Sequence, residues 1–177
     1  MRRAFLRHIQ KDIHLNQSNQ FIFLSIMQIN EFVKNFPQEK FDDIEVFQKK
    51  FKSFFGDNFW KSEEIKNFVK TNKNLVLVAF NDKKIIGLGI FIRVDVCLDI
   101  YTLFVAPFYR NKNIGSKFLD KAKLFCNLNS LKNIKLEVNR KNKKAIEFYK
   151  KNNFLCIGTR KNYYGFNDDA LIMEFII

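Results

Sequence analysis

The chain has 177 residues and a formal net charge of +13 at pH 7, with 31 lysines and arginines against 18 aspartates and glutamates. The length fits one domain with a full hydrophobic core, and a hydrophobic content of 47% excludes a disordered chain. No apolar run reaches the roughly 20 residues that a membrane-spanning helix needs.

Residues 1–20 are polar and basic without a clear period, so we expect an N-terminal extension ahead of a domain at residues 21–177. His8 and Asp12 interrupt the apolar stretch that a signal peptide would need, which predicts a cytoplasmic protein. Residues 21–33 are predicted to form a first strand region.

Two helices are predicted next. Apolar residues recur at three- and four-residue steps from Phe41 to Phe55, which is the pattern of an amphipathic helix, and Gly56 ends it. Ser62 is predicted to be the N-cap of a second helix, because two glutamates follow it in the first turn, where the helix dipole favours negative charge.

The middle of the chain changes to the residue types of strands. Runs at 75–80, 84–94 and 98–105 are rich in such residues, and the turn residues 81–83 predict a hairpin between the first two runs. Three such strands in succession predict an antiparallel meander. Pro107 interrupts this pattern, and a further helix is predicted from Gly115.

The C-terminal part is predicted to contain a strand at 134–138, a helix at 142–152, and two strands at 155–160 and 170–177 around a polar loop. The order is strand, two helices, three strands, helix, strand, helix and two strands. This order predicts a single α/β domain whose mixed central sheet contains the meander and is flanked by helices.

The cysteines do not point to a disulfide framework or a metal site. Cys97, Cys126 and Cys156 are far apart and form no C-x-x-C pair, and the chain has only 2 histidines. We expect three reduced thiols packed as small hydrophobic residues.

A basic loop between a predicted strand and helix is the most informative segment. It runs from Leu103 to Ser116, and Gly115 opens the helix. The free N–H groups at a helix start carry partial positive charge, and Arg110 and Lys112 add full charges, so the segment suits a pyrophosphate. With one glycine alone, an ordinary strand–turn–helix connection with solvated basic residues remains the alternative.

The segment Arg110-Asn-Lys-Asn-Ile-Gly115 resembles the acyl-CoA loop of the Gcn5-related N-acetyltransferase (GNAT) superfamily, whose pattern is R/Q-x-x-G-x-G/A. Downstream, the order and spacing are similar to the same superfamily at Leu136-Glu-Val138, Asn142, Ala145-Ile146, Tyr149 and Asn153-Phe154. The ending resembles the bacterial enzymes that acetylate the N-terminal alanine of a small-subunit ribosomal protein, at Arg160 to Tyr164, Asp169-Ala170 and Met173. Residues 59–63 match the same subfamily more loosely.

The resemblance implies a GNAT fold and direct transfer of an acetyl group from acetyl-CoA to an amine, with no metal. It implies that Glu137 is the general base and that Tyr149 is the acid that protonates the leaving thiolate. It assigns acetyl-CoA binding to the strand end, the loop and two helix starts, namely Leu103, Phe104, Val105, Arg110, Asn111, Lys112, Asn113, Ile114, Gly115, Ser116 and Asn142.

The resemblance also implies a groove for the acceptor's N-terminus, lined by Trp60, Tyr163 and Tyr164, with Asp168 and Asp169 suited to a cationic amine. Ordinary structural roles stay open for the same residues. The alternatives are a solvent-facing strand residue for Glu137, a core aromatic for Tyr149 and a helix N-cap for Asn142, which could serve both roles. For the two tyrosines, surface aromatics of a hairpin are an equal alternative.

Two positions depart from the family pattern. Asn113 stands where the family has its first loop glycine, and Asn153 where a Gly-Phe pair is usual. Asparagine tolerates the left-handed backbone best after glycine, so we expect both residues to keep the backbone path. The extra side chain of Asn113 would lie beside the pyrophosphate, where it would weaken acetyl-CoA binding without abolishing it.

Three functions remain open at this stage. The first is N-terminal acetylation of a ribosomal protein, the second is acetylation of a lysine side chain, polyamine or small amine, and the third is a non-catalytic basic module that binds the ribosome or RNA. The net charge of +13 favours contact with RNA or CoA phosphates. It is equally explained by the codon usage of an AT-rich genome, since the chain has 22 phenylalanines and abundant Lys, Asn and Ile.

Overall fold

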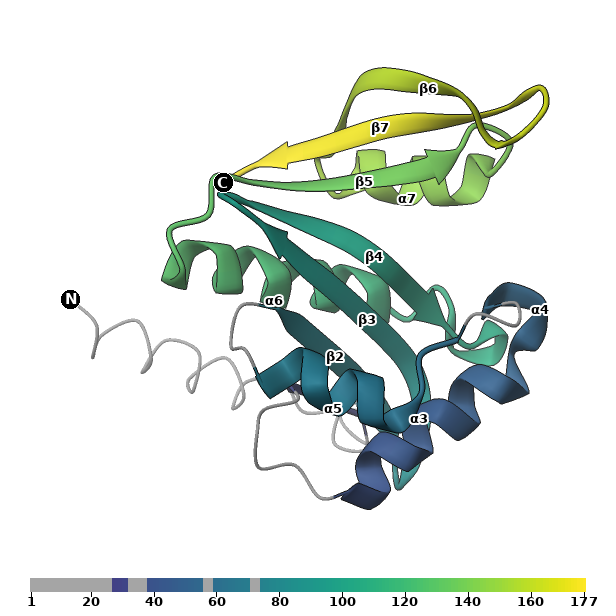
Figure 1. Ribbon diagram of the computed structural model, residues 1–177, viewed down its shortest axis with the longest axis vertical. Helices are drawn as coiled ribbons and strands as arrows, with labels where there is room; N and C mark the ends of the chain where they lie inside the picture. The colour runs from purple at the N-terminus through teal and green to yellow at the C-terminus, as the bar shows by residue number, and fades with distance from the viewer. Residues whose placement is uncertain (1–26, 32–37, 56–58, 71–73) are drawn as a thin grey trace, which may run out of the picture.

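The computed structural model describes residues 27–31, 38–55, 59–70 and 74–177. The predicted extension at 1–20 lies outside these residues, as does the predicted first strand except for 27–31. The described residues form a 7-stranded sheet of order β1-β2-β3-β4-β5-β7-β6 (Figure 1). The predicted α/β class is therefore confirmed, and so is the predicted order of elements, except that the single helix predicted from Phe41 to Phe55 is two helices.

The strands of the sheet are β1 (Met27–Glu31), β2 (Leu75–Asn81), β3 (Lys84–Val94), β4 (Cys97–Val105), β5 (Asn133–Asn139), β6 (Leu155–Gly165) and β7 (Asp168–Ile176). The helices are α3 (Gln38–Lys50), α4 (Lys52–Phe55), α5 (Ser62–Lys70), α6 (Ile114–Leu128) and α7 (Lys143–Lys151), with a short 3-10 helix η1 (Pro107–Tyr109). Strands β1 to β4 are antiparallel, which confirms the predicted meander, and β4 and β5 are parallel.

The meander is buried on both faces. In β2, six successive residues are buried, and their side chains alternate between two hydrophobic clusters. One cluster contains the buried faces of α6 and α7, and the other those of α3 and α5. Helices therefore cover both faces of the sheet (Figure 1). Each fully buried aliphatic or aromatic side chain contributes roughly 1.5–3 kcal/mol, so the two clusters stabilise the sheet strongly.

Helix α5 begins one residue away from the prediction. The carbonyl of Lys61 accepts the first helical bond from Ile65 (3.1 Å), so Lys61 is the N-cap residue and Ser62 is the first helical residue. Carboxylates satisfy the exposed donors: Glu64 accepts from the Lys61 N–H (2.8 Å), and Glu45 of α3 accepts from the Ser62 N–H (2.8 Å). The hydrogen bond from Lys49, together with that from Ser62, lowers the pKa of Glu45 to about 2.

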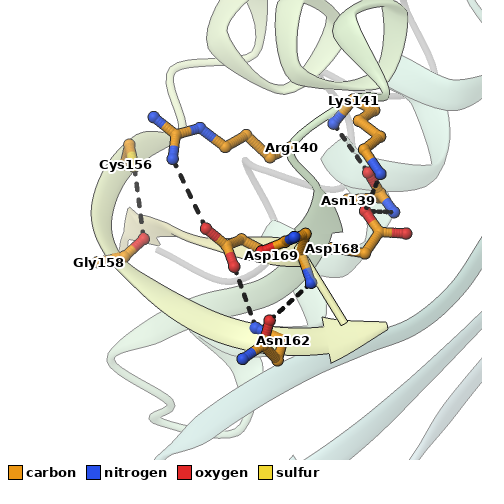
Figure 2. A network of polar contacts seen from close by, with 9 residues as sticks. Asn139, Arg140, Lys141, Cys156, Gly158, Asn162, Asp168 and Asp169 are labelled. Carbon is orange, nitrogen blue, oxygen red and sulfur yellow. Dashed lines mark hydrogen bonds and ion pairs between the residues drawn. The ribbon is translucent and has the colours of Figure 1, made fainter. Parts of the chain in front are cut away.

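The predicted polar loop between the last two strands is mostly strand. Strand β6 continues to Gly165, and the turn to β7 contains only Phe166 and Asn167. Asn162, in the left-handed region at φ 57°, accepts from the Asn167 N–H (2.8 Å), while its own N–H donates to Asp169 (3.0 Å) (Figure 2). These local bonds extend the hairpin beyond the point where the hydrophobic pattern stops.

Gln48 connects α3 to the segment that precedes α5. Its side chain is 1% exposed, and it donates to the Trp60 carbonyl (2.8 Å) and accepts from the Trp60 N–H (3.1 Å). Both backbone groups of Trp60 are thus satisfied by a single amide. Because an unsatisfied buried polar group is costly, this contact fixes where the only tryptophan of the chain lies.

We expect Gln48→Ala to lower the free energy of unfolding by about 2 kcal/mol, because it leaves two backbone groups of Trp60 without a partner. Urea unfolding followed by Trp60 fluorescence measures the change. Val46→Ala, on the same helix with 64% of the side chain exposed, is the matched control and should change stability by less than about 0.5 kcal/mol. Equal effects of the two substitutions would contradict the role of Gln48.

Candidate functional site

The sheet splits between β4 and β5. Pairing of these parallel strands is limited to three positions, from Cys97↔Asn133 to Asp99↔Lys135. Beyond them, β4 stays paired with β3 as far as Val105, and β5 stays paired with β7 as far as Asn139. Figure 1 shows β4 and β5 diverging from a common end. The split leaves backbone N–H and C=O groups of both strands facing each other without a ladder, which is where an extended ligand can form hydrogen bonds.

A β-bulge occurs in β4 where the split begins. Thr102 pairs with Ile90 and Ile100 pairs with Phe91, so Tyr101 is the extra residue. Bulges bend a strand and increase its twist locally. The bulge at Tyr101 therefore turns the second half of β4 away from β5, and it projects the exposed Tyr101 side chain next to Trp60, with ring centroids 5.5 Å apart.

The predicted acetyl-CoA loop joins the end of β4 to α6. Side chains of Leu103 and Val105 pack against the α6–α7 cluster, whereas Phe104 is buried on the other face. Arg110 folds back over the strand end, where its Nε donates to the Val105 carbonyl (3.1 Å) and its guanidinium lies 5.8 Å from the centre of the Phe104 ring. Lys112 lies over the Tyr109 ring. The loop thus carries two cations within four residues of the start of α6.

Left-handed asparagines shape this loop. Asn111 and Asn113 both have φ 59°, and Asn113 is the N-cap residue of α6. Asn113 thus adopts the backbone conformation expected for the missing glycine. The retained Gly115 has a different function: a Cβ there would lie 2.9 Å from the Phe148 ring, so Gly115 lets α7 pack closely against the first turn of α6. By helix geometry, the N–H groups of the first turn of α6, around Gly115 and Ser116, have no intrahelical acceptor.

Caps at both ends fix the position of α7. The side chain of Asn142 accepts from the Ala145 N–H (3.1 Å), so the N-cap interpretation of Asn142 is confirmed. At the other end, the N–H groups of Asn153 and Phe154 donate to the carbonyls of Lys150 and Tyr149, which is a Schellman motif with Asn153 at φ 68°. The expectation that Asn153 replaces glycine as the residue after the C-cap is confirmed.

The Schellman motif also determines the surroundings of Tyr149. Its ring is 8% exposed and contacts the rings of Phe148 and Phe154 at 5.1 and 5.5 Å. Burial raises the pKa of Tyr149, and the neighbouring Tyr164 raises it further, so the phenol stays neutral at physiological pH. Its hydroxyl makes no hydrogen bond to the described residues. Tyr149 is therefore a core aromatic that keeps a neutral O–H donor.

Glu137 lies on the opposite face of the sheet from Tyr149. Alternation along β5 buries Leu136 and Val138 against α6 and α7, which leaves Glu137 partly buried on the α3–α5 side. Arg160 of β6 forms an ion pair with Glu137 (3.3 Å). Tyr164 lies between the two predicted catalytic residues: its hydroxyl donates to the Glu137 carbonyl (3.4 Å), and it influences the pKa of Tyr149. Burial, then Tyr163 and Glu137, raise the pKa of Tyr164.

The predicted acceptor-binding aromatics lie on either side of the split. Trp60 packs against Tyr101 of β4 and Phe68 of α5, and Tyr164 lies against β5 with Tyr163 in edge contact at 4.9 Å. Aromatic side chains thus lie on both sides of the split: Trp60 and Tyr101 on the α5 side, and Tyr163 and Tyr164 of the β6–β7 hairpin on the other.

The acidic pair Asp168 and Asp169 does not act as a free anionic patch. Asp168 pairs with Lys141 (3.2 Å) and accepts from Asn139 (2.9 Å), while Asp169 pairs with Arg140 (3.6 Å) and accepts from Asn162 (Figure 2). Cations from the β5–α7 connection neutralise both carboxylates. Their role in the structure is to anchor the hairpin, which differs from the sequence expectation of a seat for a cationic amine.

Sequence reasoning missed two residues at the split, Asp99 and Tyr101, and it missed the contact that Arg160 makes there. Asp99 is the last β4 residue paired with β5, Tyr101 is the bulge, and Arg160 holds Glu137. The sequence did contain a signal for Asp99, because it is a single charged residue between the apolar residues Leu98 and Ile100 of a predicted strand. Burial and the charge of Glu137 raise the pKa of Asp99.

The three cysteines are free thiols, but they are not all packed as the small hydrophobic residues that the sequence predicted: Cys126 is buried, Cys97 is partly buried and Cys156 is exposed. The described residues contain no group of three or more His, Cys, Asp or Glu side chains that could hold a metal ion, and His8 and His14 lie outside them. No helix within the described ranges is long and apolar enough to cross a membrane.

A family model described as "Acetyltransferase (GNAT) family" matches residues 31–154, a range that includes the split, the basic loop and α7. The chain belongs to this family. GNAT enzymes use acetyl-CoA, and solved structures with the same fold include complexes with coenzyme A and with acetyl coenzyme A. The split edge of β4, the two loop cations and the first turn of α6 fit an acyl-CoA molecule, since they offer backbone hydrogen bonds to an extended chain and positive charge to its phosphates.

Individual relatives agree with the family assignment. N-alpha-acetyltransferase 50 of Danio rerio is 34% identical over 117 residues, which are 62% of this chain and 65% of that protein. The chain therefore matches less than two thirds of the length of this relative. The GNAT acetyltransferase of Streptococcus pneumoniae has the same fold, with a TM-score of 0.73 and 20% identity over 85% of this chain and 99% of that one. The ribosomal-protein-S18-alanine N-acetyltransferase of Escherichia coli superposes with a TM-score of 0.67 and 18% identity, over 85% and 94% of the two chains.

Proposed function

We propose that this protein transfers the acetyl group of acetyl-CoA directly to the N-terminal amine of a protein, with the N-terminal alanine of a small-subunit ribosomal protein as the acceptor. The observation that carries the proposal is the split between β4 and β5, with the basic loop after β4 and with Glu137, Trp60 and Tyr101 on the α3–α5 side. The reaction would take place in the cytoplasm, where such acceptors are made.

Two similarities support an N-terminal amine over other acceptors. One relative is an N-alpha-acetyltransferase, and one protein of the same fold is a ribosomal-protein-S18-alanine N-acetyltransferase. The C-terminal hairpin residues from Arg160 to Tyr164 resemble the same subfamily. Some of the chain's surplus positive charge lies at the acetyl-CoA loop, and the remainder would suit ribosomal RNA near the acceptor.

Glu137 would remove the proton that prevents the amine from attacking. An α-amino group has a pKa of about 7.7–8.0, so most of it is protonated at neutral pH and a base accelerates the reaction. Glu137 fits this role because it lies on the acceptor side, partly buried, at a point where β5 no longer pairs with β4.

Tyr149 would protonate the leaving sulfur from the other face. Burial keeps its phenol neutral, which is the form that donates a proton. Its hydroxyl forms no hydrogen bond with the described residues, so no such bond has to break before the proton is transferred. Backbone N–H groups near Val105, on the unpaired edge of β4, would hold the oxygen of the acetyl carbonyl as negative charge develops on it.

The proposal predicts acetylation of one of two test peptides. The first peptide has a free N-terminal alanine and no lysine, and the second has a blocked N-terminus and one internal lysine. The purified protein with acetyl-CoA should add a single acetyl group to the alanine peptide alone, as read by mass spectrometry. Acetylation of the lysine peptide alone would assign another acceptor to the same fold, and reaction with neither peptide, despite acetyl-CoA binding, would exclude both peptide acceptors.

We expect Tyr149→Phe to lower kcat by about 10²- to 10⁴-fold, the range for losing a general acid, while the affinity for acetyl-CoA changes little. The phenyl ring preserves the contacts with Phe148 and Phe154, so only the O–H is lost. Steady-state kinetics and calorimetric titration separate the two effects.

Tyr109→Phe is the matched control for this prediction, because it also removes one hydroxyl, which here accepts from Asn81 (3.2 Å). Its kcat should stay close to that of the unmodified protein. If Tyr149→Phe reduced turnover and acetyl-CoA affinity to the same degree, Tyr149 would be a packing residue and not the acid.

A further inference from the structure

Positive charge is distributed unevenly over the elements of the fold. Residues 140–169, which run from the end of β5 through α7 and β6 to the start of β7, contain 8 lysines and arginines against 3 aspartates and glutamates. Residues 38–55 and 59–70, which contain helices α3 to α5, have 7 against 6. The codon usage of an AT-rich genome enriches lysine in both regions, so it does not explain why only one of them has a surplus.

Most cations of residues 140–169 have no carboxylate beside them. Arg140, Lys141 and Arg160 each form an ion pair. The other five are exposed, and their side chains form no ion pair or hydrogen bond with the described residues: Lys143, Lys144, Lys150, Lys151 and Lys161. Four of these five lie on α7, on the side away from its buried face. Such a surface attracts polyanions, whose phosphates supply the missing negative charge.

Phe166 lies at the tip of the neighbouring β6–β7 hairpin, and 89% of its side chain is exposed. Its ring makes no aromatic or cation contact within the described part of the chain. Two-residue turns favour small or polar residues, as at Asn167 with φ 57°, so a large apolar side chain is unusual there. A residue that breaks a local rule without a structural gain indicates a functional site.

A polar network fixes the turn that carries Phe166. Asn162 accepts from the Asn167 N–H (2.8 Å), and its own N–H donates to Asp169 (3.0 Å). Asp169 pairs in turn with Arg140 (3.6 Å), in the connection that leads into α7 (Figure 2). The same contacts hold the tip of the hairpin next to the start of α7, as Figure 1 also shows. The exposed ring and the lysines of α7 therefore belong to one surface.

We propose that this surface, the tip of the β6–β7 hairpin with the exposed side of α7, binds single-stranded RNA. A base would stack on the ring of Phe166, and the α7 lysines would contact the phosphates, which is how proteins bind single strands without reading their sequence. The choice of RNA rests on the proposed function, because a ribosomal protein lies next to RNA once it is assembled. Bound RNA would lie beside Tyr163 and Tyr164 of the same hairpin, at the edge of the predicted acceptor groove.

An anionic membrane is a different partner for lysines and an aromatic ring, and the arrangement of apolar residues disfavours it. A helix that lies on a membrane directs its apolar side to the lipid. The apolar side of α7 is buried against the sheet, and its exposed residues are four lysines and Glu147. Leu155 and Ile157, which are also exposed, lie at the other end of β6 from Phe166.

The salt dependence of RNA binding tests the lysines. The probe is a fluorescently labelled single-stranded RNA of about 12 nucleotides, and its binding is followed by anisotropy from about 50 to 200 mM salt. The Lys143→Ala/Lys144→Ala variant should bind more weakly, and its slope of log K against log salt should become shallower by about 0.7–1.4, because each lost phosphate contact contributes about 0.7.

The matched control is Lys83→Ala/Lys84→Ala, which removes two adjacent exposed lysines at the turn between β2 and β3. These lysines form no ion pair or hydrogen bond with the described residues either. Affinity and slope should both stay unchanged in this variant. Equal changes in the two double variants would show that the RNA contacts the positive charge of the protein in general, which would overturn the inference.

Phe166→Ala tests base stacking and gives a different signature. It should lower the affinity for the single strand about fivefold or more, while the salt slope stays the same because no phosphate contact is lost. Phe166→Trp should retain the affinity. Phe108→Ala, at a side chain that is 91% exposed on η1, is the control and should have no effect. Equal losses from Phe166→Ala and Phe108→Ala would contradict a specific role of Phe166.

Two further probes separate single-stranded RNA from other polyanions. An RNA duplex of the same sequence should bind with no dependence on Phe166, because its bases are already stacked on one another. Vesicles of phosphatidylcholine and phosphatidylserine should not bind detectably in the same salt range. Binding to the vesicles that depends on Phe166, while RNA binding does not, would assign the surface to a membrane and overturn the inference.

Acetylation of the short alanine peptide separates this surface from the proposed function. Phe166→Ala should acetylate that peptide at the rate of the unmodified protein, because Phe166 lies outside the split and its acetyl-CoA loop. A protein that acetylates the peptide but does not bind the RNA refutes the surface and leaves the proposed function standing. A protein that binds the RNA with the stated dependences but acetylates no peptide supports the surface and contradicts the proposed function.

Discussion

Most of the site depends on one interruption of backbone pairing, the loss of the ladder between β4 and β5 after Asp99 and Lys135. A continuous ladder would close the sheet and leave no passage between its faces. With the split, a donor held on the α6–α7 side and an acceptor on the α3–α5 side can meet between the strands. The bulge at Tyr101 bends β4 where the ladder ends, and the two strands remain rigid because each is still paired with its other neighbour.

The groups around the split are positioned by helix ends. Asn113 begins α6 with a left-handed residue, so that the free N–H groups of the first turn directly follow the basic loop. Asn142 and the Schellman motif at Asn153 fix both ends of α7 and thereby the place of Tyr149. Gly115 allows the two helices to approach, since any side chain there would meet Phe148. Local capping chemistry thus sets the distance between the loop and the phenol.

The order of elements and the basic loop could be predicted from the sequence because they depend on local patterns, such as the run of apolar, strand-forming residues in β2 and the turn after it. The left-handed backbone at Asn113 and Asn153 could be predicted because asparagine stands there where the family has glycine. The pairing of Asp168 and Asp169 with Arg140 and Lys141, and of Glu137 with Arg160, could not be predicted, because these contacts join residues that only the sheet register brings together. The extra residue at Tyr101 likewise depends on pairing with β3.

Hydrogen exchange with and without acetyl-CoA tests the split as the binding site most directly. Two groups of amides should exchange more slowly when acetyl-CoA is bound: those of residues 100–105, on the unpaired edge of β4, and those of residues 113–116, at the start of α6. The reason is that the ligand supplies hydrogen-bond acceptors to N–H groups that have none within the fold. Amides of residues 77–81 in β2, which pair with both β1 and β3, serve as the internal reference. Saturating acetyl-CoA that protects neither segment, or that protects only a distant surface, would contradict this account of the site.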